Sequence, residues 1–441
     1  MKRGLSQITG VLLMGIMIVL TVTLVTFLFR LERDGEPDQT GTQHSHAPII
    51  IDTSQDYSRI ESVSLSPTAQ SDSIISVHGY EALTDEHMRY LYQQLDESVY
   101  KISDEVNEDG RYKTEMIRLS GISMNSASIN TAINAYLFDH PQVFWIDNYF
   151  GYRIEDEYTY VECYSVLSGN QCELYIKRFY EELSAMLSVI DPSDGKYDRE
   201  RKLHDALLEK CTYKKGVDSI EDGWQYFSVY GAIVDGQAVC EGYAKAMMLM
   251  LNLVGVDCTT VRGGSMDERH MWNLVELDGS WYHLDSTWDD TEDDYTHEFF
   301  NLTTESILLD HTLDLLITDI PYTDDFNYNF FLPECTSDEM NYFVREGIVV
   351  NSLDQQTAQE IVSLICEKAL NDDTIIPIKI GDDLRYSDFL NTMFENGGNT
   401  FYTYIEQANG YLDESHQMST ESCRLMKNES RKTVRVRLFN A

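Results

Sequence analysis

The pattern of hydrophobic and polar positions changes along this chain of 441 residues and divides it into segments. Residues 11–29 contain no charged side chain, and about 20 such residues can cross a bilayer as a helix. Residues 34–77 carry one apolar cluster among many Ser, Asp, Thr and Gln residues. Such a segment buries too little surface to offset the entropy of ordering, so we expect a flexible linker. From residue 78 onward, periodic apolar positions predict folded domains.

The uncharged run is longer than the core of a cleavable signal peptide, and no small-residue cleavage pattern follows it. We therefore expect residues 1–33 to form an uncleaved signal anchor with one transmembrane helix. Basic residues lie on both sides of the run, so the charge rule favours an inside amino terminus only slightly. The large acidic remainder, which has no second apolar run, favours the same orientation. This predicts a single-pass protein of the cell membrane with its bulk outside the cytoplasm.

Two segments flank the centre of the chain and are expected to form smaller α+β accessory domains. In residues 78–192, helical spacing predicts an amphipathic helix over 85–98, capped by Thr84, and a second helix over 126–138. Strands are expected there over 151–153, 158–166 and 172–176. Residues 331–441 alternate between strand and helix, beginning with a strand, which is typical of a small α+β sandwich. These segments are 342–350, 354–369, 374–380, 385–394, 401–405 and 433–438.

The centre of the chain contains a candidate nucleophile, Cys240. Residues 237–254 are apolar on nearly every side, which predicts a buried helix, with Gly255 closing it. Cys240 falls in the first turn, where unpaired N–H groups and the helix dipole favour an anion. The thiolate is the nucleophilic form of cysteine, and the first turn of a helix stabilises the thiolate. The alternative is a small buried residue without a chemical role, since free cysteine is often buried.

A predicted hairpin follows and carries a histidine and an aspartate. Residues 271–277 and 281–286 alternate as strands around Asp278-Gly279, a strong type I′ turn signal. A two-residue turn places Asp285 opposite Trp272, with His270 two residues further along the same face and within reach of the carboxylate. A three-residue turn would place Asp285 on the other face. In the favoured register the order Cys240, His270, Asp285 forms a nucleophile, a base and an orienting carboxylate.

The oxyanion donors of such a site are less clearly marked. The backbone N–H of Cys240 is a natural candidate, and an upstream side chain must supply another donor. Gln237, one helical turn before the cysteine in the predicted helix, is our candidate. Trp224 and Tyr230 are also near in sequence, and Gln237 could instead be an ordinary surface residue.

The segments SVYGAIVDGQAV, CEGYAKA at 240–246 and HMWNLVELDGSWYHLDSTWDD at 270–290 resemble the bacterial transglutaminase-like superfamily, which has a papain-like fold. The resemblance covers about residues 203–300, within an expected catalytic domain over 193–330. It implies an α+β core in which Cys240, at a helix N-terminus packed on an antiparallel sheet, is the nucleophile. His270 would be the general base and acid, and Asp285 its partner. Members form amide crosslinks, hydrolyse peptides, deamidate glutamine or have lost catalysis, so the motif names no substrate.

Composition narrows the partners. The chain has 33 basic and 74 acidic residues, a net charge of −41, which argues against nucleic acid and anionic membrane surfaces because both attract basic proteins. Eight cysteines without a C-x-x-C pair make a zinc site unexpected, and Cys163 and Cys172, on either side of a predicted turn, could pair. The acidic run 289–294 has oxygen ligands for calcium, but its spacing is not that of an EF-hand, so we expect a solvated loop. No cofactor or metal is predicted.

Three interpretations follow. The first is a membrane-anchored, extracytoplasmic cysteine enzyme that acts on peptide or glutamine amides through a Cys240 thioester, as a peptidase, amidase or protein-glutamine acyltransferase. Its partners would be a peptide or protein substrate and the membrane that holds the N-terminal helix. The second is a catalytically silent module that binds peptides in the same cleft, and the third is a structural surface protein. All three residues of the expected triad are present, which favours the enzyme.

Overall fold

The computed structural model of the chain describes residues 77–441 apart from 108, 267, 292–294, 320–326 and 396–398, together with the short strands 50–52 and 62–64. The predicted signal anchor at 1–33 lies outside these residues, as does most of the expected linker. Within the described part of the chain, no helix combines the length and the apolar character needed to cross a membrane. The linker prediction is wrong for the two short strands, which pair with strands of the N-terminal sheet.

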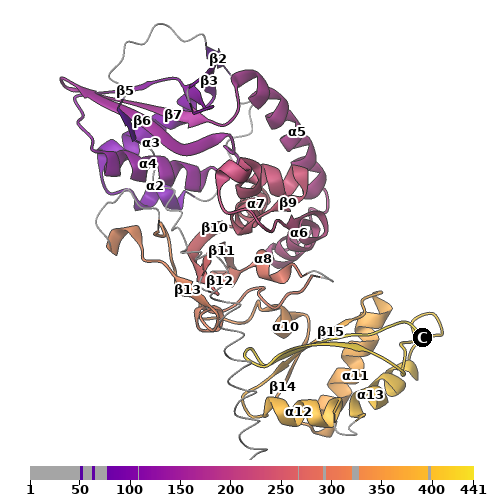
Figure 1. Cartoon of the computed structure of the whole chain (residues 1–441). Coiled ribbons are helices and arrows are strands. Elements are labelled where there is room, and N and C mark those ends of the chain that lie inside the picture. Colours follow the sequence, from indigo (N-terminus) through magenta and orange to yellow (C-terminus); the bar gives the residue numbers. More distant parts are fainter. Residues whose placement is uncertain are drawn as a thin grey trace, which may run out of the picture. The chain divides into compact units, whose positions relative to one another are not determined.

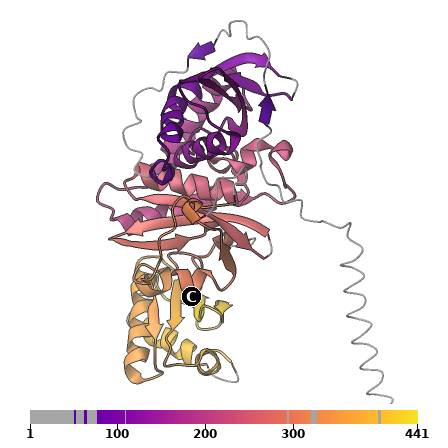
Figure 2. The same cartoon turned by 90° about the vertical axis from the view of Figure 1, so that its left-hand side faces the viewer.

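The N-terminal region contains a sheet of seven described strands in the order β1-β6-β7-β4-β3-β2, with β5 also paired to β7. These strands are β1 (Ile50–Asp52), β2 (Ser62–Ser64), β3 (Lys101–Val106), β4 (Tyr112–Thr114), β5 (Ile117–Ser120), β6 (Ile146–Glu155) and β7 (Tyr158–Ser165). Helices α2 (His78–Ala82), α3 (Glu86–Ser98) and α4 (Ser126–Asp139) lie together on one side of the sheet (Figures 1 and 2). The two predicted helices are confirmed, but the cap of α3 is Asp85 instead of Thr84, since the Asp85 carboxylate accepts the His87 amide.

The strand predicted over 172–176 is wrong, because these residues belong to helix α5 (Gly169–Leu187). Ser168 and Gln171 form a capping box in which each side chain accepts the backbone amide of the other residue. That local signal starts a helix and overrides the strand-like residues that follow. Cys163 and Cys172 are buried free thiols, so the disulfide considered for them is not formed.

The central region packs a helix against a four-stranded antiparallel sheet in the order β12-β11-β10-β13. The strands are β10 (Cys258–Ser265), β11 (Glu268–Leu277), β12 (Ser280–Leu284) and β13 (His311–Leu313). Helix α7 (Cys240–Leu253) lies on one face, where the Asn273 side chain donates to the Ala244 carbonyl at 2.8 Å. The other elements are α6 (Lys196–Lys210), β8 (Thr212–Tyr213), η2 (Ile220–Asp222), η3 (Trp224–Phe227), η4 (Gly231–Asp235), β9 (Gln237–Ala238), α8 (Ser286–Asp289), α9 (Thr304–Ile307) and η5 (Ile317–Asp319).

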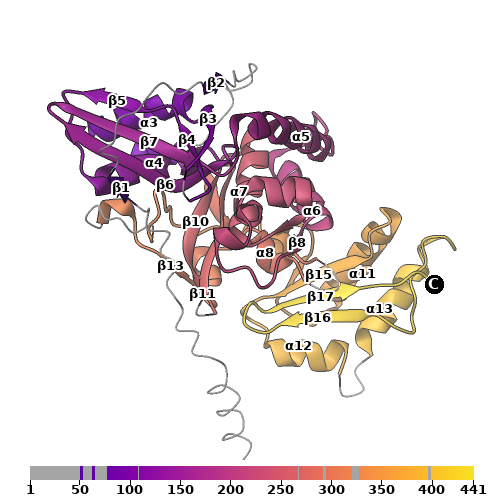
Figure 3. The same ribbon diagram turned by 45° about the horizontal axis from the view of Figure 1, so that its top comes forward.

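The C-terminal region is an α+β unit, as predicted, with a sheet in the order β14-β15-β17-β16. Strands β15, β17 and β16 lie side by side in Figure 3. The elements are α10 (Tyr342–Arg345), β14 (Ile348–Val350), α11 (Gln355–Leu370), β15 (Ile375–Ile380), α12 (Tyr386–Met393), α13 (Thr400–Asn409), β16 (Arg424–Asn428) and β17 (Thr433–Arg437).

Two predictions for this region are wrong. The segment 342–350 opens with the helical turn α10 before strand β14, and the strand expected over 401–405 is part of helix α13. The aromatic residues of 401–405 favour strand locally. Yet the buried residues of α13 are spaced three or four apart, as on one face of a helix. In a strand, every second residue would be buried. The buried residues of α13 are Phe401, Tyr404, Ile405 and Ala408.

Two hydrophobic clusters surround the central sheet. The larger one joins the N-terminal region to the α7 side of the sheet and includes Tyr243 and Val275. The smaller one lies on the other face and contains Val261, Trp272 and Leu274. Because side chains alternate along a strand, His270 shares the face of this smaller cluster. A third cluster fills the C-terminal region.

Candidate active site

Cys240 is the first residue of helix α7, three residues later than the predicted helix start. The preceding residues 237–238 form the short strand β9, which pairs in parallel with β8, so Val239 is extended and the helix begins behind it. The amide of Cys240 is therefore one of the first four N–H groups of the helix, which have no partner inside it. The side chain is half-buried. This is the environment expected of a reactive cysteine.

A close approach of the η3 turn shapes this helix start. A Cβ atom on Gly242 would lie 2.8 Å from the Tyr226 carbonyl oxygen and 2.7 Å from the Ala238 side chain. The amide of Val239 donates to the same Tyr226 carbonyl at 2.9 Å. Glycine at the third position of the helix thus lets the backbone of η3 pass directly beside the turn that carries Cys240.

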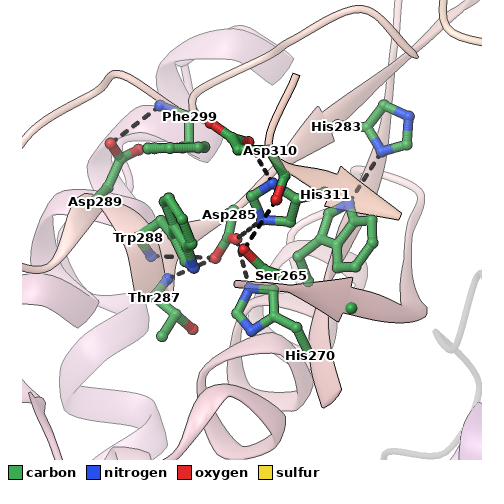
Figure 4. Close-up of polar contacts among 12 residues, drawn as sticks. Ser265, His270, His283, Asp285, Thr287, Trp288, Asp289, Phe299, Asp310 and His311 are labelled. Atoms are coloured by element: carbon green, nitrogen blue, oxygen red, sulfur yellow. Dashed lines mark hydrogen bonds and ion pairs between the residues drawn. The ribbon is translucent and has the colours of Figure 1, made fainter. Parts of the chain in front are cut away.

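The predicted hairpin register is confirmed. Leu277 pairs with Ser280, and Asn273 with Leu284. Asp278 and Gly279 both have positive φ, 52° and 89°, as a type I′ turn requires. The consequence is the contact that the register predicted: His270 Nε2 lies 2.6 Å from Asp285 Oδ2 (Figure 4).

Asp285 divides its two oxygens between two tasks. Oδ1 accepts the amides of Thr287 and Trp288 at 3.0 and 3.2 Å and so caps helix α8. Oδ2 faces His270 and also His311 Nε2, at 3.0 Å. Burial alone would raise the pKa of Asp285, but the charges and hydrogen bonds of the two histidines outweigh it and hold that pKa well below its usual range. The carboxylate is therefore charged.

His270 is the predicted base, and its Nε2 is engaged by this carboxylate. Burial by itself would lower the pKa of His270, but the charge and hydrogen bond of Asp285 raise it to about 10, and the Cys240 side chain contributes in the same direction. Since Nε2 is engaged by Asp285, Nδ1 is the ring nitrogen left for Cys240. A protonated imidazole between a carboxylate and a cysteine can stabilise a thiolate and later deliver its proton.

The remaining expected site residue, Gln237, lies on strand β9 and is exposed. Its amide oxygen accepts from Lys214 Nζ at 3.2 Å, which leaves its NH₂ group as the donor. Because the helix begins at residue 240, Gln237 is not on the helix as expected. Its role in an oxyanion site stays a prediction.

Two further residues at the site were missed from the sequence. The first is His311, 26 residues beyond Asp285 and brought to it by the pairing of β13 with β10. The second is Tyr213, which is 41% exposed as a residue but whose phenol is enclosed enough that burial, and then the charge of Cys240, raise its pKa to about 12, so it stays protonated. A lone histidine in a short strand and a tyrosine in an exposed one carry no local signal of a site.

The acidic run after the hairpin is not the solvated loop that was expected, at least at its start. Asp289 is fully buried and accepts from Thr296 Oγ1 at 2.7 Å and from the Phe299 amide at 3.1 Å. Asp290 accepts from the Tyr243 hydroxyl and the Tyr213 amide. These carboxylates fasten the loop to the domain, so they are structural. Residues 292–294 lie outside the described residues.

Two groups of described residues bring metal-type donors within 4.8 Å of one another: His270, Asp285 and His311, and His204, Asp205 and His297. In each group one nitrogen–oxygen separation is short, 2.6 and 2.7 Å respectively. These are hydrogen-bond distances. Two ligands of one zinc ion would stand further apart, since each lies about 2 Å from the metal in a tetrahedral arrangement. The geometry of both groups is that of hydrogen bonds between histidine nitrogens and carboxylate oxygens.

Residues 186–286 match the model of the transglutaminase-like superfamily, and this span contains Cys240, His270 and Asp285. The central region therefore carries a transglutaminase-like domain, as predicted. The chain is 35% identical over 109 residues to kyphoscoliosis peptidase of Homo sapiens, covering 21% of this chain and 16% of that protein. Kyphoscoliosis peptidase of Mus musculus is 35% identical over 98 residues, covering 17% and 14%. The chain thus spans about a sixth of the length of these relatives.

Similar solved structures include the crystal structure of a TGase, with a TM-score of 0.27 and 12% identity, covering 50% of this chain and 61% of that one. A candidate cysteine protease from Cytophaga hutchinsonii has a TM-score of 0.21 and 11% identity, covering 31% and 55%.

Proposed function

We propose that this protein is a cysteine enzyme that acts on peptide or glutamine amides through a thioester on Cys240. One observation carries the proposal: His270 is hydrogen-bonded to the charged Asp285, and Cys240, the first residue of helix α7, contributes to the raised pKa of His270. This supports the assignment of Cys240, His270 and Asp285, from three separate elements, as nucleophile, base and orienting group of an acyl transfer.

The first half of the reaction follows from this geometry. Cys240 Sγ attacks the amide carbonyl, and the carbonyl oxygen gains negative charge beside the N–H groups of the first turn of α7. The C–N bond then breaks, and the leaving amine takes the proton of His270. The products of this half are a thioester on Cys240 and a neutral His270, with Asp285 still charged.

The second half regenerates the enzyme. Neutral His270 removes a proton from water or from an amine as that group attacks the thioester, and the thiolate leaves. Water gives a carboxylic acid, as in a peptidase or amidase, and an amine gives a new amide, as in an acyltransferase. The similarity to proteins named peptidases makes hydrolysis the outcome to test first.

We also propose that the protein is anchored in the cell membrane by residues 1–33 with its bulk outside the cytoplasm. The uncharged run 11–29 supports this. Protease added to intact cells should digest the domains, and washing membranes with carbonate should not release the protein. Protection of the domains in intact cells would overturn the orientation.

The enzymatic proposal is tested by incubating the protein with glutamine-containing peptides, with and without a labelled primary amine. Mass spectrometry would detect cleavage, deamidation or amine incorporation, and Cys240→Ala is the control. Turnover that persists in Cys240→Ala would refute the proposal. Peptide binding without turnover in the wild type would favour a silent peptide-binding module.

A further inference from the structure

The hydrogen-bonded series at the active site continues beyond Asp285 into the C-terminal region. His311 Nε2 lies 3.0 Å from Asp285 Oδ2, and His311 Nδ1 lies 2.6 Å from Asp310 Oδ1 (Figure 4). Arg431 then donates two hydrogen bonds to the Asp310 carboxylate, from Nη1 to Oδ2 at 2.8 Å and from Nη2 to Oδ1 at 2.9 Å. Such a two-point pair is among the strongest and most directional contacts available to a carboxylate.

We propose that His311, Asp310 and Arg431 are positioning residues of the active site, which fix Asp285 and set the charge that it presents to His270. Through them the C-terminal region is a working part of the catalytic centre. This inference rests on the proposed function, because it assigns these residues to the same reaction.

Two members of the series, His311 and Arg431, are buried, while the side chain of Asp310 between them is 28% exposed. His311 is 2% exposed and Arg431 8%. The Arg431 guanidinium lies 4.2 Å from the centre of the Phe299 ring and donates to the Ser306 carbonyl. A buried cation is costly to desolvate unless it is well paired, and here its pairing is directed at the residue next to His311.

A simple docking role for Arg431 would not require this partner. The same turn of the C-terminal region already contacts the central region nearby, where Thr433 Oγ1 donates to Glu298 Oε2 at 2.6 Å. That second contact is buried too, and its link to Asp285 is through the backbone, since the Phe299 carbonyl next to Glu298 accepts the Asp285 amide at 3.0 Å. Thr433 therefore supplies a matched control that weakens docking and leaves the series intact.

The charges along the series alternate. Burial would lower the pKa of His311, but hydrogen bonds to Asp285 and Asp310 raise it, and each ring nitrogen faces a carboxylate oxygen, which favours the protonated ring. Burial would raise the pKa of Asp310, but His311 and Arg431 lower it. The other titratable group facing His311 is His283, whose pKa is lowered to about 3 by burial and by the charge of His311, so it stays neutral.

The charge of His311 affects the pKa of His270 in a direction that an experiment can measure. The rings of His270 and His311 are 5.3 Å apart between centroids, and their like charges oppose each other. Removing the charge of His311 must therefore raise the pKa of His270. For like charges at 4–6 Å the shift is on the order of one unit.

The test compares His311→Gln, Asp310→Asn, Arg431→Met and Arg431→Lys with Thr433→Val in the full chain. Two quantities are measured: the pH at which turnover falls on the alkaline side, and the titration of His270 followed by NMR with labelled histidine. We expect His311→Gln to move both upward by about one unit, and Asp310→Asn to move them by less, because the latter substitution removes a negative charge as well as the partner of His311. Arg431→Met should lower kcat about two- to thirtyfold with KM nearly unchanged, the range seen for residues that act through contiguous contacts. Arg431→Lys should recover part of this loss, and Thr433→Val should leave the His270 titration unchanged.

An unchanged His270 titration in His311→Gln and Asp310→Asn would overturn the inference, as would an equal shift in Thr433→Val. If Arg431→Met does not fold, Arg431→Lys and Asp310→Asn decide the question, since each keeps a polar side chain at the position. The NMR titration needs no turnover. An inactive wild type would therefore refute the proposed function alone, and the shift of His270 would still decide the positioning role.

Discussion

Two buried clusters in the central region are built from the same parts and differ in what they can do. In one, His270 and His311 share an oxygen of Asp285, at 2.6 and 3.0 Å. In the other, His297 and His204 share an oxygen of Asp205, at 2.7 and 3.2 Å. Composition and spacing do not separate a catalytic cluster from a structural one.

The difference lies at the outer end of each cluster. In the first cluster, the half-buried Cys240 at the start of α7 contributes to the raised pKa of His270. The series through His204 reaches Asp289, 3.3 Å away, and His297 stacks on the Tyr342 ring with centroids 3.9 Å apart. His204, His297 and Asp289 are buried and the Asp205 side chain is 20% exposed, and together these residues connect three segments of the chain. We infer that the first cluster differs from the second in the cysteine at the end of its series, which could serve as a nucleophile.

The largest effect that tests this contrast is expected for Cys240→Ala. Removing the nucleophile should lower kcat about 10⁶-fold, as in other enzymes whose triads act as a unit. The fold should be unchanged, because a methyl group fits where a half-buried thiol stood. Turnover and the circular dichroism spectrum are the measurements. A variant as active as the wild type would remove the distinction between the two clusters.

Asp285 offers a sharper test, because its two oxygens can be separated. Asn at this position keeps an acceptor for the amides of Thr287 and Trp288 but loses the charge, and we expect turnover about 10³- to 10⁴-fold lower with stability nearly unchanged. Asp285→Ala loses the helix cap as well and should cost about 1 kcal/mol more in unfolding free energy. Thermal melts and single-turnover rates distinguish the two. Equal stability of both variants would contradict the capping role.

The pH dependence gives a smaller but directed effect. The pKa of His270 is raised to about 10, so the leaving amine should lose its proton donor as pH rises through that value. We expect kcat/KM to fall about tenfold per unit above pH 10. In His204→Leu, kcat/KM measured between pH 8 and about 11 should fall over the same pH range as in the wild type, since His204 is not in the catalytic series. A fall of kcat/KM near the ordinary histidine pKa of about 6.5 would contradict the role of Asp285.

The smallest effect on turnover is expected for His204→Leu, although its effect on stability is large. Burial would lower the pKa of His204, but Asp205 and Asp289 raise it to about 9, above its unfolded value of about 6.5. The protonated form therefore stabilises the fold fully below about pH 6.5, and this contribution is lost as pH rises through about 9. We expect the variant to lose about 3–5 kcal/mol at pH 6, because two carboxylates stay buried without their cation. The difference in unfolding free energy between the variant and the wild type, measured by chemical denaturation, should become smaller toward pH 9. Loss of turnover in a folded variant would make this cluster part of the active site.

The sequence predicted the site better than its surroundings, for a local reason. The hairpin register follows from the Asp278-Gly279 turn alone, and it placed Asp285 beside His270. The start of α7 was misplaced because strand β9 depends on pairing with β8, 25 residues away in sequence. His311 could not be predicted, since its approach to Asp285 depends on the pairing of β13 with β10. Nothing in the sequence near Arg431 indicates that it faces Asp310.

The capping of helix α8 by Asp285 bears on how such a protein changes over evolutionary time. The same side chain is held in place by folding and by chemistry, because one oxygen serves the helix and the other serves His270. A descendant that no longer needed the reaction would still be selected to keep an oxygen acceptor at this position. Cys240, in contrast, is assigned only to the proposed reaction. In a lineage drifting toward a purely binding role the cysteine would be replaced first, and the aspartate would persist as a relic of the enzyme.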